Sequence, residues 1–318
     1  MTAYSSPGQS ERVMSNPRSD RVRDLAKLAK RSVRSRREEF LVEGPQAVRE
    51  VLKAHHDARS AGKPALLREV YASADCLERF PEIAELSAAS GALVHLADDA
   101  VLAALADTVT PQGVVAVCRF LDVPLEAVFA DSPRLLAVLC RVQDPGNAGT
   151  ILRAADAAGA DAVVFTSGSV DAYNPKTVRS TAGSLFHVPV VLNADLDELA
   201  GLCQSRGITV LAADGYGAEN LDELQDQAAI RRLAAAGEPW SALDASPARL
   251  ELATTWLFGN EAQGLCTAEL DLADSRVAVP IYGAAESLNV GTAATVCLYA
   301  SARAQQPVDR TGEEPLTS

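Results

Sequence analysis

From residue 135 onward, short apolar segments alternate with segments whose apolar residues recur at helical spacing. The apolar segments are typical of buried strands: LLAVLCRV (135–142), AVVFT (162–166), VPVVLN (188–193), ITVLAAD (208–214), TTWLFG (254–259) and RVAVP (276–280). Strands that alternate with helices pair in parallel, because each helix returns the chain across the sheet and covers one of its faces. The sequence therefore predicts an α/β domain with a mainly parallel sheet.

A smaller set of strands and helices precedes residue 120. Its apolar segments are FLV (40–42), LLREVYAS (66–73), ALVHLA (92–97) and GVVAVCRF (113–120). We expect, in chain order, a disordered N-terminus (1–17), a small α/β domain (18–120), a linker (121–134), the parallel-sheet domain (135–305) and a disordered tail (306–318). A polar stretch at 215–253 is interpreted as a partly helical insertion.

Composition and cysteine placement argue against several classes of protein. No apolar run is long enough to span a bilayer, and the polar start MTAYSSPGQSERV lacks the apolar core of a secretory signal, so we expect a cytoplasmic protein. The six cysteines are scattered, with no CxxC pair and no suitably placed histidine. They are interpreted as reduced packing residues, and no metal site is expected.

One basic segment stands out in a chain whose formal net charge is -13. Between Arg18 and Arg37, nine of twenty residues are Arg or Lys. Apolar residues at helical spacing predict one amphipathic helix with a cationic outer face. Such a face can bind RNA phosphates, although charge runs are often only solvated surface. The candidate RNA-binding residues are Arg31, Arg34, Arg36 and Arg37.

A first motif lies in VQDPGNAGTILRAADAAGADAVVF, residues 142–165. Asp144, Pro145 and Gly146 predict a turn, and Asn147 is expected to cap the helix that follows. Arg153 falls off the buried stripe of that helix and is expected to face the cleft beyond the strand ends. The alternative is a solvated arginine and a simple helix cap.

Two further motifs combine glycines with polar residues. In LFGNEAQGL (257–265), two glycines bracket a polar group; in VAVPIYGAAESLNVGTAATVCLYA (277–300), a polar loop leads into a helix of small residues. Taken singly, these motifs are also compatible with a plain turn and with ordinary close packing.

The three motifs, in this order, resemble the SpoU/TrmH family of RNA ribose 2′-O-methyltransferases in the SPOUT superfamily. The segment YNPKTVRSTAGSLFHVPV (173–190) is also similar to that family, so the likeness covers nearly all of 135–305. The basic segment with FLVEGPQAVREVL (40–52) resembles the substrate-binding domain that precedes many such enzymes.

The resemblance implies S-adenosylmethionine as cofactor and a C-terminal trefoil knot, a rare exception to unknotted chains. By position, the cofactor would contact Gly259, Val279, Ile281 and Leu288. The catalytic positions would be Arg153, Asn147, Glu261, Ser287 and Asn289. A guanidinium is an awkward base, so we expect Arg153 to orient a phosphate and to stabilise the developing alkoxide, whether or not it also takes the proton.

The resemblance also implies a homodimer, with the last helix as an interface. The chain departs from the family pattern at Ala262, where glycine is commoner, and in the long 215–253 stretch. Ribosomal RNA is the favoured substrate because of the N-terminal module; tRNA, an antibiotic-resistance methylase and a non-catalytic RNA-binding protein on the same fold are alternatives. A dinucleotide-dependent oxidoreductase is disfavoured because no GxGxxG follows the first strand.

Overall fold

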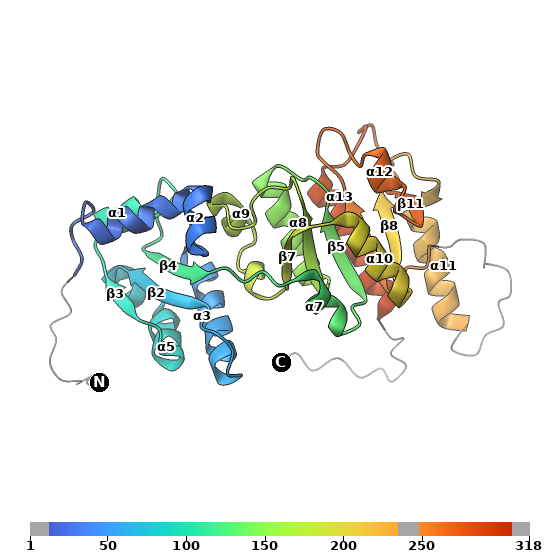
Figure 1. Ribbon diagram of the computed structural model, residues 1–318. Helices are drawn as coiled ribbons and strands as arrows, with labels where there is room; N and C mark the ends of the chain where they lie inside the picture. Colours follow the sequence, from blue (N-terminus) through green and yellow to red (C-terminus); the bar gives the residue numbers. More distant parts are fainter. Residues whose placement is uncertain (1–12, 235–247, 307–318) are drawn as a thin grey trace. The chain divides into compact units, whose positions relative to one another are not determined.

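The computed structural model describes residues 13–234 and 248–306 and divides into two compact units (Figure 1). The first unit comprises the residues up to Leu121 together with Tyr173–His187. The second comprises Asp122–Ala172 and the residues from Val188 onward. The chain thus leaves the second unit after its first βαβ segment, returns to the first unit for fifteen residues (173–187), and then completes the second.

A four-stranded sheet forms the centre of the first unit. Its strands are, in spatial order, β1 (Glu39–Glu43), β4 (Val114–Arg119), β2 (Leu67–Ala72) and β3 (Val94–Leu96). The pairs β1–β4 and β4–β2 are antiparallel, and β2–β3 is parallel. The helices of this unit that follow β1 are α3 (Pro45–Ser60), α4 (Ala74–Arg79), α5 (Pro81–Ser90), α6 (Asp99–Leu105) and, in the returning segment, α9 (Pro175–Ser180). The small α/β fold expected before residue 120 is confirmed.

The basic segment is not one helix, as the sequence predicted. It forms α1 (Asp20–Ala26), a 3-10 turn (Lys27–Ala29) and α2 (Arg31–Arg37), separated by the extended backbone of Lys30. Burial of Val22, Leu25 and Leu28 against the sheet holds the first helix and the turn in place. Within α2, Arg34 is buried while Arg31 and Arg36 are exposed.

The expected disordered ends lie mostly outside the described residues. The prediction is wrong for residues 13–17, which the structure describes. Met14 donates its backbone N–H to Leu96 O at 2.8 Å and accepts from Asp98 N at 3.0 Å, so it extends the edge of the first sheet beyond β3.

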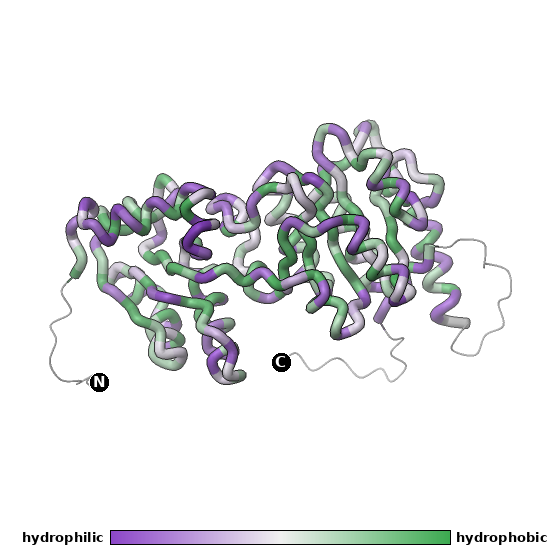
Figure 2. Tube along the Cα trace, in the orientation of Figure 1, coloured by the Kyte–Doolittle hydropathy of each residue, from purple (hydrophilic) through white to green (hydrophobic). Residues whose placement is uncertain are grey.

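A seven-stranded sheet forms the centre of the second unit, and every strand pair in it is parallel. Its strands are, in spatial order, β7 (Val190–Ala194), β6 (Ala162–Thr166), β5 (Leu135–Leu139), β10 (Thr254–Phe258), β8 (Thr209–Ala213), β11 (Ser275–Ala278) and β9 (Glu219–Asn220). Figure 2 shows the central strands as mostly hydrophobic, as expected for a sheet covered on both faces. The predicted parallel α/β fold is confirmed.

Helices cover both faces of this sheet. On one face, α7 (Leu125–Ala130) and α10 (Leu196–Arg206) share a core with Leu136, Val138 and Leu257. On the other face, α8 (Pro145–Ala157) and α13 (Val290–Gln305) pack against each other and against β5, and Trp256 Nε1 donates to Ser301 Oγ at 2.9 Å. Two further helices, α11 (Leu221–Ala234) and α12 (Thr267–Leu270), complete the described part of the unit.

The expected linker, from residue 122 onward, and the described part of the polar stretch 215–253 both belong to the folded second unit. The interpreted linker, 121–134, contains α7, whose Leu125, Val128 and Phe129 are buried in the core of the second unit. The described part of the 215–253 stretch is partly helical, as expected: it supplies the edge strand β9 and the helix α11. Both segments contribute buried apolar side chains, among them Phe129 and Leu224.

Candidate active site

The helix α8 is capped by a different residue from the one expected, and the side chain of Asn147 is therefore available for other contacts. Asp144, not Asn147, is the N-cap: its carboxylate accepts from Asn147 N at 2.9 Å, with Pro145 at the first helical position. The Asn147 amide therefore points elsewhere. Its Nδ2 donates to Glu261 Oε1 at 3.1 Å, and its Oδ1 accepts from Asn289 Nδ2 at 3.0 Å.

Glu261 lies in the loop of the second motif, residues 257–265, which is called the motif-2 loop below. It connects this loop to the start of α8 by hydrogen bonds. Its carboxylate accepts from the backbone N–H groups of Gln143 at 3.1 Å and Asp144 at 2.9 Å, besides the Asn147 amide. Partial burial alone would raise the pKa of Glu261, but these N–H donors outweigh it and hold the pKa below its ordinary value. The carboxylate is therefore ionised at neutral pH, with its oxygens committed to donors.

Asn289 is the N-cap of α13. Its Oδ1 accepts from Gly291 N at 2.9 Å and from Thr292 N at 3.4 Å, while its amide nitrogen donates to Asn147. A Cβ on Gly291 would lie 3.0 Å from Thr150 Cγ2, so a larger residue would crowd α8. The small residue thus lets the two helices approach closely at the point where the asparagines meet.

A cavity of about 410 Å³ opens beside this cluster, at the carboxyl ends of β8, β10 and β11. All four expected cofactor residues line it, as do three of the five expected catalytic residues. The lining residues named in the sequence analysis are Gly259, Val279, Ile281, Leu288, Glu261, Ser287 and Asn289. Open parallel sheets bind ligands in this position, and the volume is that of a small-molecule site.

The composition of the walls fits S-adenosylmethionine. Apolar side chains of Phe258, Val277 and Leu288 can cover an adenine ring, and loop backbone supplies polar groups. A Cβ on Gly259 would lie 2.3 Å from the carbonyl carbon of Gly264, so only glycine permits the tight turn that forms this wall. Ala262, which replaces a commoner glycine, has no positive φ and fits the turn.

Arg153 is placed apart from this cavity. It is exposed on α8, while Ile151, Leu152 and Ala155 are buried as expected. Six residues separate it from Asn147, which corresponds to about 9 Å along a helix. Among the described residues, the cavity lining includes Glu261 and Asn289 but not Arg153.

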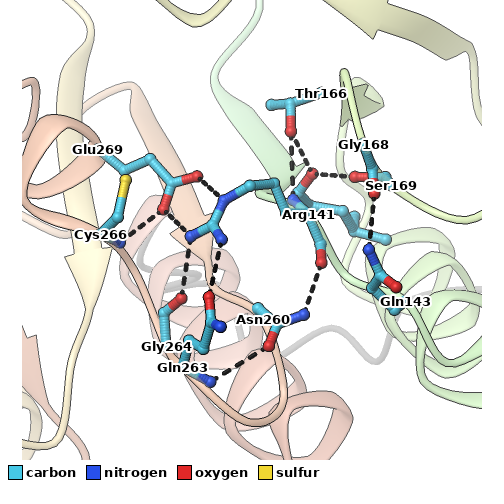
Figure 3. Close-up of polar contacts among 11 residues, drawn as sticks. Arg141, Gln143, Thr166, Gly168, Ser169, Asn260, Gln263, Gly264, Cys266 and Glu269 are labelled. Atoms are coloured by element: carbon cyan, nitrogen blue, oxygen red, sulfur yellow. Dashed lines mark hydrogen bonds and ion pairs between the residues drawn. The ribbon is translucent and has the colours of Figure 1, made fainter.

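A second polar cluster, which no motif in the sequence predicted, lies beneath the motif-2 loop (Figure 3). Arg141 forms a bidentate ion pair with Glu269, in which both N–O distances are 2.8 Å. Glu269 also accepts from Cys266 N at 2.8 Å in a capping box at the start of α12. The spacing Cys266-x-x-Glu269 is the sequence signal that could have indicated this helix start. Cys266 is exposed, whereas the other five cysteines are buried.

In the first unit, the four candidate RNA-binding arginines separate into two pairs. Arg34 is buried, and its guanidinium donates to Leu28 O at 2.8 Å and to Ala29 O at 2.7 Å, so its expected place on the outer face is wrong. Arg37 pairs with Asp24 and Glu39. Arg31 and Arg36 are exposed and have no ion pair within the described residues.

Comparison with known proteins agrees with this architecture. Residues 134–299 match the SpoU rRNA Methylase family, and residues 41–124 match the RNA 2′-O ribose methyltransferase substrate binding family. No helix in the described ranges is both long and apolar enough to cross a membrane.

Individual relatives extend over most of the chain. The 23S rRNA (guanosine(2553)-2′-O)-methyltransferase RlmP of Bacillus subtilis is 33% identical over 285 residues, covering 89% of this chain and 96% of the relative. The 23S rRNA (guanosine-2′-O-)-methyltransferase RlmB of Bordetella pertussis is 30% identical, covering 78% and 94%.

Among solved structures, the SpoU methyltransferase AviRb of Streptomyces viridochromogenes in complex with AdoMet superposes with a TM-score of 0.70. It is 27% identical, and the match covers 90% of this chain and 98% of that one. The chain belongs to the SpoU rRNA methylase family and is an S-adenosylmethionine-dependent RNA ribose 2′-O-methyltransferase.

Proposed function

We propose that the substrate of this enzyme is a ribose of 23S ribosomal RNA and that the cavity beside Asn289 holds the cofactor. The observation that carries the proposal is the hydrogen-bonded chain Glu261–Asn147–Asn289 at the cavity rim. It joins three separate motifs in one place. The names of the RlmP and RlmB relatives support the choice of RNA. A ribosomal substrate also implies that the enzyme acts in the cytoplasm.

Bound S-adenosylmethionine would supply a methyl group on a sulfonium centre. Gly259 and Leu288 would hold its adenosine through loop backbone and apolar contact, with Val279 and Ile281 on the adjacent wall. Ser287 and Asn289 at the same rim would direct the reactive end toward the RNA. These roles need no metal ion.

In the transfer, the 2′-oxygen would form a bond to the methyl carbon as the carbon–sulfur bond breaks, the neutral thioether would leave, and the hydroxyl proton would pass to solvent. Glu261 is a poor base because three N–H donors already occupy its carboxylate and lower its pKa. Its role is to fix the loop before α8. A guanidinium is also a poor proton acceptor at neutral pH, so Arg153 would orient a phosphate and stabilise the developing alkoxide.

Arg153 is exposed and, within the described ranges, does not line the cavity of its own chain. We therefore place it in an active site that two chains form together. On α13, the apolar side chains of Val296 and Tyr299 are 38% and 49% exposed and lie about one turn apart on the same side. Exposed apolar groups at this spacing are typical of a helix that packs against a partner. In the proposed homodimer, α13 contacts the second copy, and Arg153 of one copy serves the cavity of the other.

In the first unit, Arg31 and Arg36 of α2 would contact RNA phosphates, together with exposed Arg23 and Lys30 of the same segment. Arg34 and Arg37 hold the segment itself in shape. The module thus binds RNA while the second unit carries the chemistry.

The test is transfer of a labelled methyl group from S-adenosylmethionine to purified 23S rRNA, 16S rRNA and bulk tRNA. The expected result is label in 23S rRNA, recovered as one 2′-O-methylated nucleotide after nuclease digestion. Label confined to tRNA would overturn the substrate assignment. Cofactor binding with no transfer to any of these RNAs would indicate a non-catalytic RNA-binding protein.

A further inference from the structure

The loop after β10 closes into a tight turn that forms one wall of the cofactor cavity. Asn260 N donates to Gly264 O at 3.1 Å and Gly264 N donates to Asn260 O at 2.8 Å. Within the turn, Asn260 Oδ1 accepts from the N–H groups of Ala262 at 3.0 Å and Gln263 at 3.2 Å. Since Asn260 and Gly264 both line the cavity, the shape of this turn sets the shape of the wall.

Arg141 holds the same turn from its other side (Figure 3). Its carbonyl oxygen accepts from Asn260 Nδ2 at 3.0 Å. Its guanidinium donates to Gly264 O and to Gln263 Oε1, both at 3.4 Å, while Glu269 fixes it in the bidentate pair. One arginine thus contacts both ends of the turn through its backbone and its side chain.

The backbone of Arg141 indicates that the side chain matters. Its φ is +56°, in the left-handed region that is unfavourable for an L-residue and freely accessible to glycine. The Arg141 N–H donates to Thr166 Oγ1 at 3.2 Å, which holds the residue in this conformation. A glycine would satisfy the backbone better, so the guanidinium is what this position supplies.

We propose that Arg141 and Glu269 are a positioning pair that holds the turn 260–264 in the shape that binds the cofactor. The inference rests on the cofactor site proposed above. Within the described residues, neither member of the pair lines the cofactor cavity, so neither is a catalytic residue. Arg141 instead lines a shallow hollow of about 490 Å³ on the reverse of the turn, with Gln143 and Gln263. The competing idea is that this hollow binds RNA.

The variants Arg141→Gly and Glu269→Gln separate these ideas. Glycine keeps the left-handed backbone and the carbonyl that accepts from Asn260, and it removes only the guanidinium. We expect the Kd for S-adenosylmethionine, measured by isothermal titration calorimetry without RNA, to rise about tenfold in each single variant. The double variant should be no weaker than either single one, because both changes remove the same contact.

A matched control is Glu251→Gln, which weakens the bidentate Arg231–Glu251 pair elsewhere in the second unit. It should leave the Kd unchanged even if the melting temperature falls. Unaltered Kd values in the Arg141 and Glu269 variants would overturn the proposal, and an accompanying rise in KM for RNA would assign the hollow to RNA. Additive losses in the double variant would also overturn the pair. These binding measurements do not test whether the wild-type enzyme transfers a methyl group to RNA. The labelling experiment described above tests that activity, so the two proposals can fail independently.

Discussion

Asn289 donates from its side-chain amide to the side-chain oxygen of Asn147 across 3.0 Å, although 142 residues separate them in sequence. The contact joins the first turns of α8 and α13 at the rim of the cavity in which we place the cofactor. Asn147 also donates to Glu261, so the same asparagine contacts both α13 and the motif-2 loop. The three motifs therefore form one hydrogen-bonded structure.

Two substitutions separate the roles of Asn289 in helix capping and in the site. Asn289→Ala should destabilise the protein by about 1 kcal/mol through loss of the N-cap and should also reduce activity. Asn289→Ser keeps a capping oxygen but lacks the amide donor to Asn147. We expect serine to restore the melting temperature while activity stays low, as judged by thermal unfolding and methyl-transfer rates. Full recovery of both would show that capping is its sole role.

Glu261 predicts a specific pH dependence of stability. Its folded-state pKa is lowered, so its contribution is fully present above its ordinary pKa of 4.5 and is lost as pH falls through the folded value. Glu261→Gln lacks this contribution at every pH. Urea unfolding should therefore show the variant less stable at neutral pH, with the difference shrinking on acidification below 4.5. A difference that does not change with pH would argue against the N–H network as its origin.

Much of the fold could be predicted from the sequence, because buried parallel strands such as β5 and β10 are continuous apolar runs that few other structures accommodate. Local capping preferences were less reliable where two neighbouring residues could both cap the same helix. Asp144 and Asn147 are both good N-caps, and only the position of Glu261, contributed by a distant loop, shows why the asparagine is needed elsewhere. The Arg141–Glu269 pair spans 128 residues, so no local pattern contains it.

The structure of the basic segment also could not be predicted from local spacing. The spacing of its apolar residues predicted one helix over 18–37, but the backbone of Lys30 is extended and divides the segment. Arg34 is buried and donates to the carbonyls of Leu28 and Ala29. Burial of an arginine is uncommon, and it depended here on backbone acceptors that the sequence does not reveal.

RNA-binding tests should distinguish the exposed arginines from the buried one. Replacing Arg31 and Arg36 with alanine should lower the slope of log K against log salt by about 1.5, with little effect on folding. Arg34→Ala should instead destabilise the protein by about 2 kcal/mol, because two carbonyls lose their donor. Filter binding over a salt series and chemical denaturation measure the two effects. Equal salt slopes in the double variant and the wild type would exclude α2 from the RNA contact.

The proposed dimer is tested at α13. Val296→Glu and Tyr299→Glu each place a charge on its exposed apolar side, where burial against a partner would be costly. Multi-angle light scattering should give a dimer for the wild type and a monomer for a variant carrying both changes. Arg206→Glu, exposed on α10 at the other face of the sheet, serves as a charge control. A monomeric wild type would require the site to be complete in one chain.

The proposed role of Arg153 depends on that proposed assembly. Arg153→Ala should reduce kcat by on the order of a hundredfold while cofactor affinity is retained, because the guanidinium acts on the RNA and not on the cofactor. Mixed dimers that combine an Arg153→Ala copy with an Asn289→Ala copy should regain one wild-type site, which is half of the activity of the wild-type dimer, only if the two residues serve a site from different chains. Calorimetry and single-turnover methyl transfer supply the two readouts.

The most direct measurement is a map of 2′-O-methyl positions in total RNA from cells that contain the gene, cells that lack it, and cells complemented with the wild type or with Arg153→Ala. The account predicts that one 23S position loses its methyl group without the gene, regains it with the wild type and does not regain it with the variant. An unchanged map, or full restoration by Arg153→Ala, would contradict it.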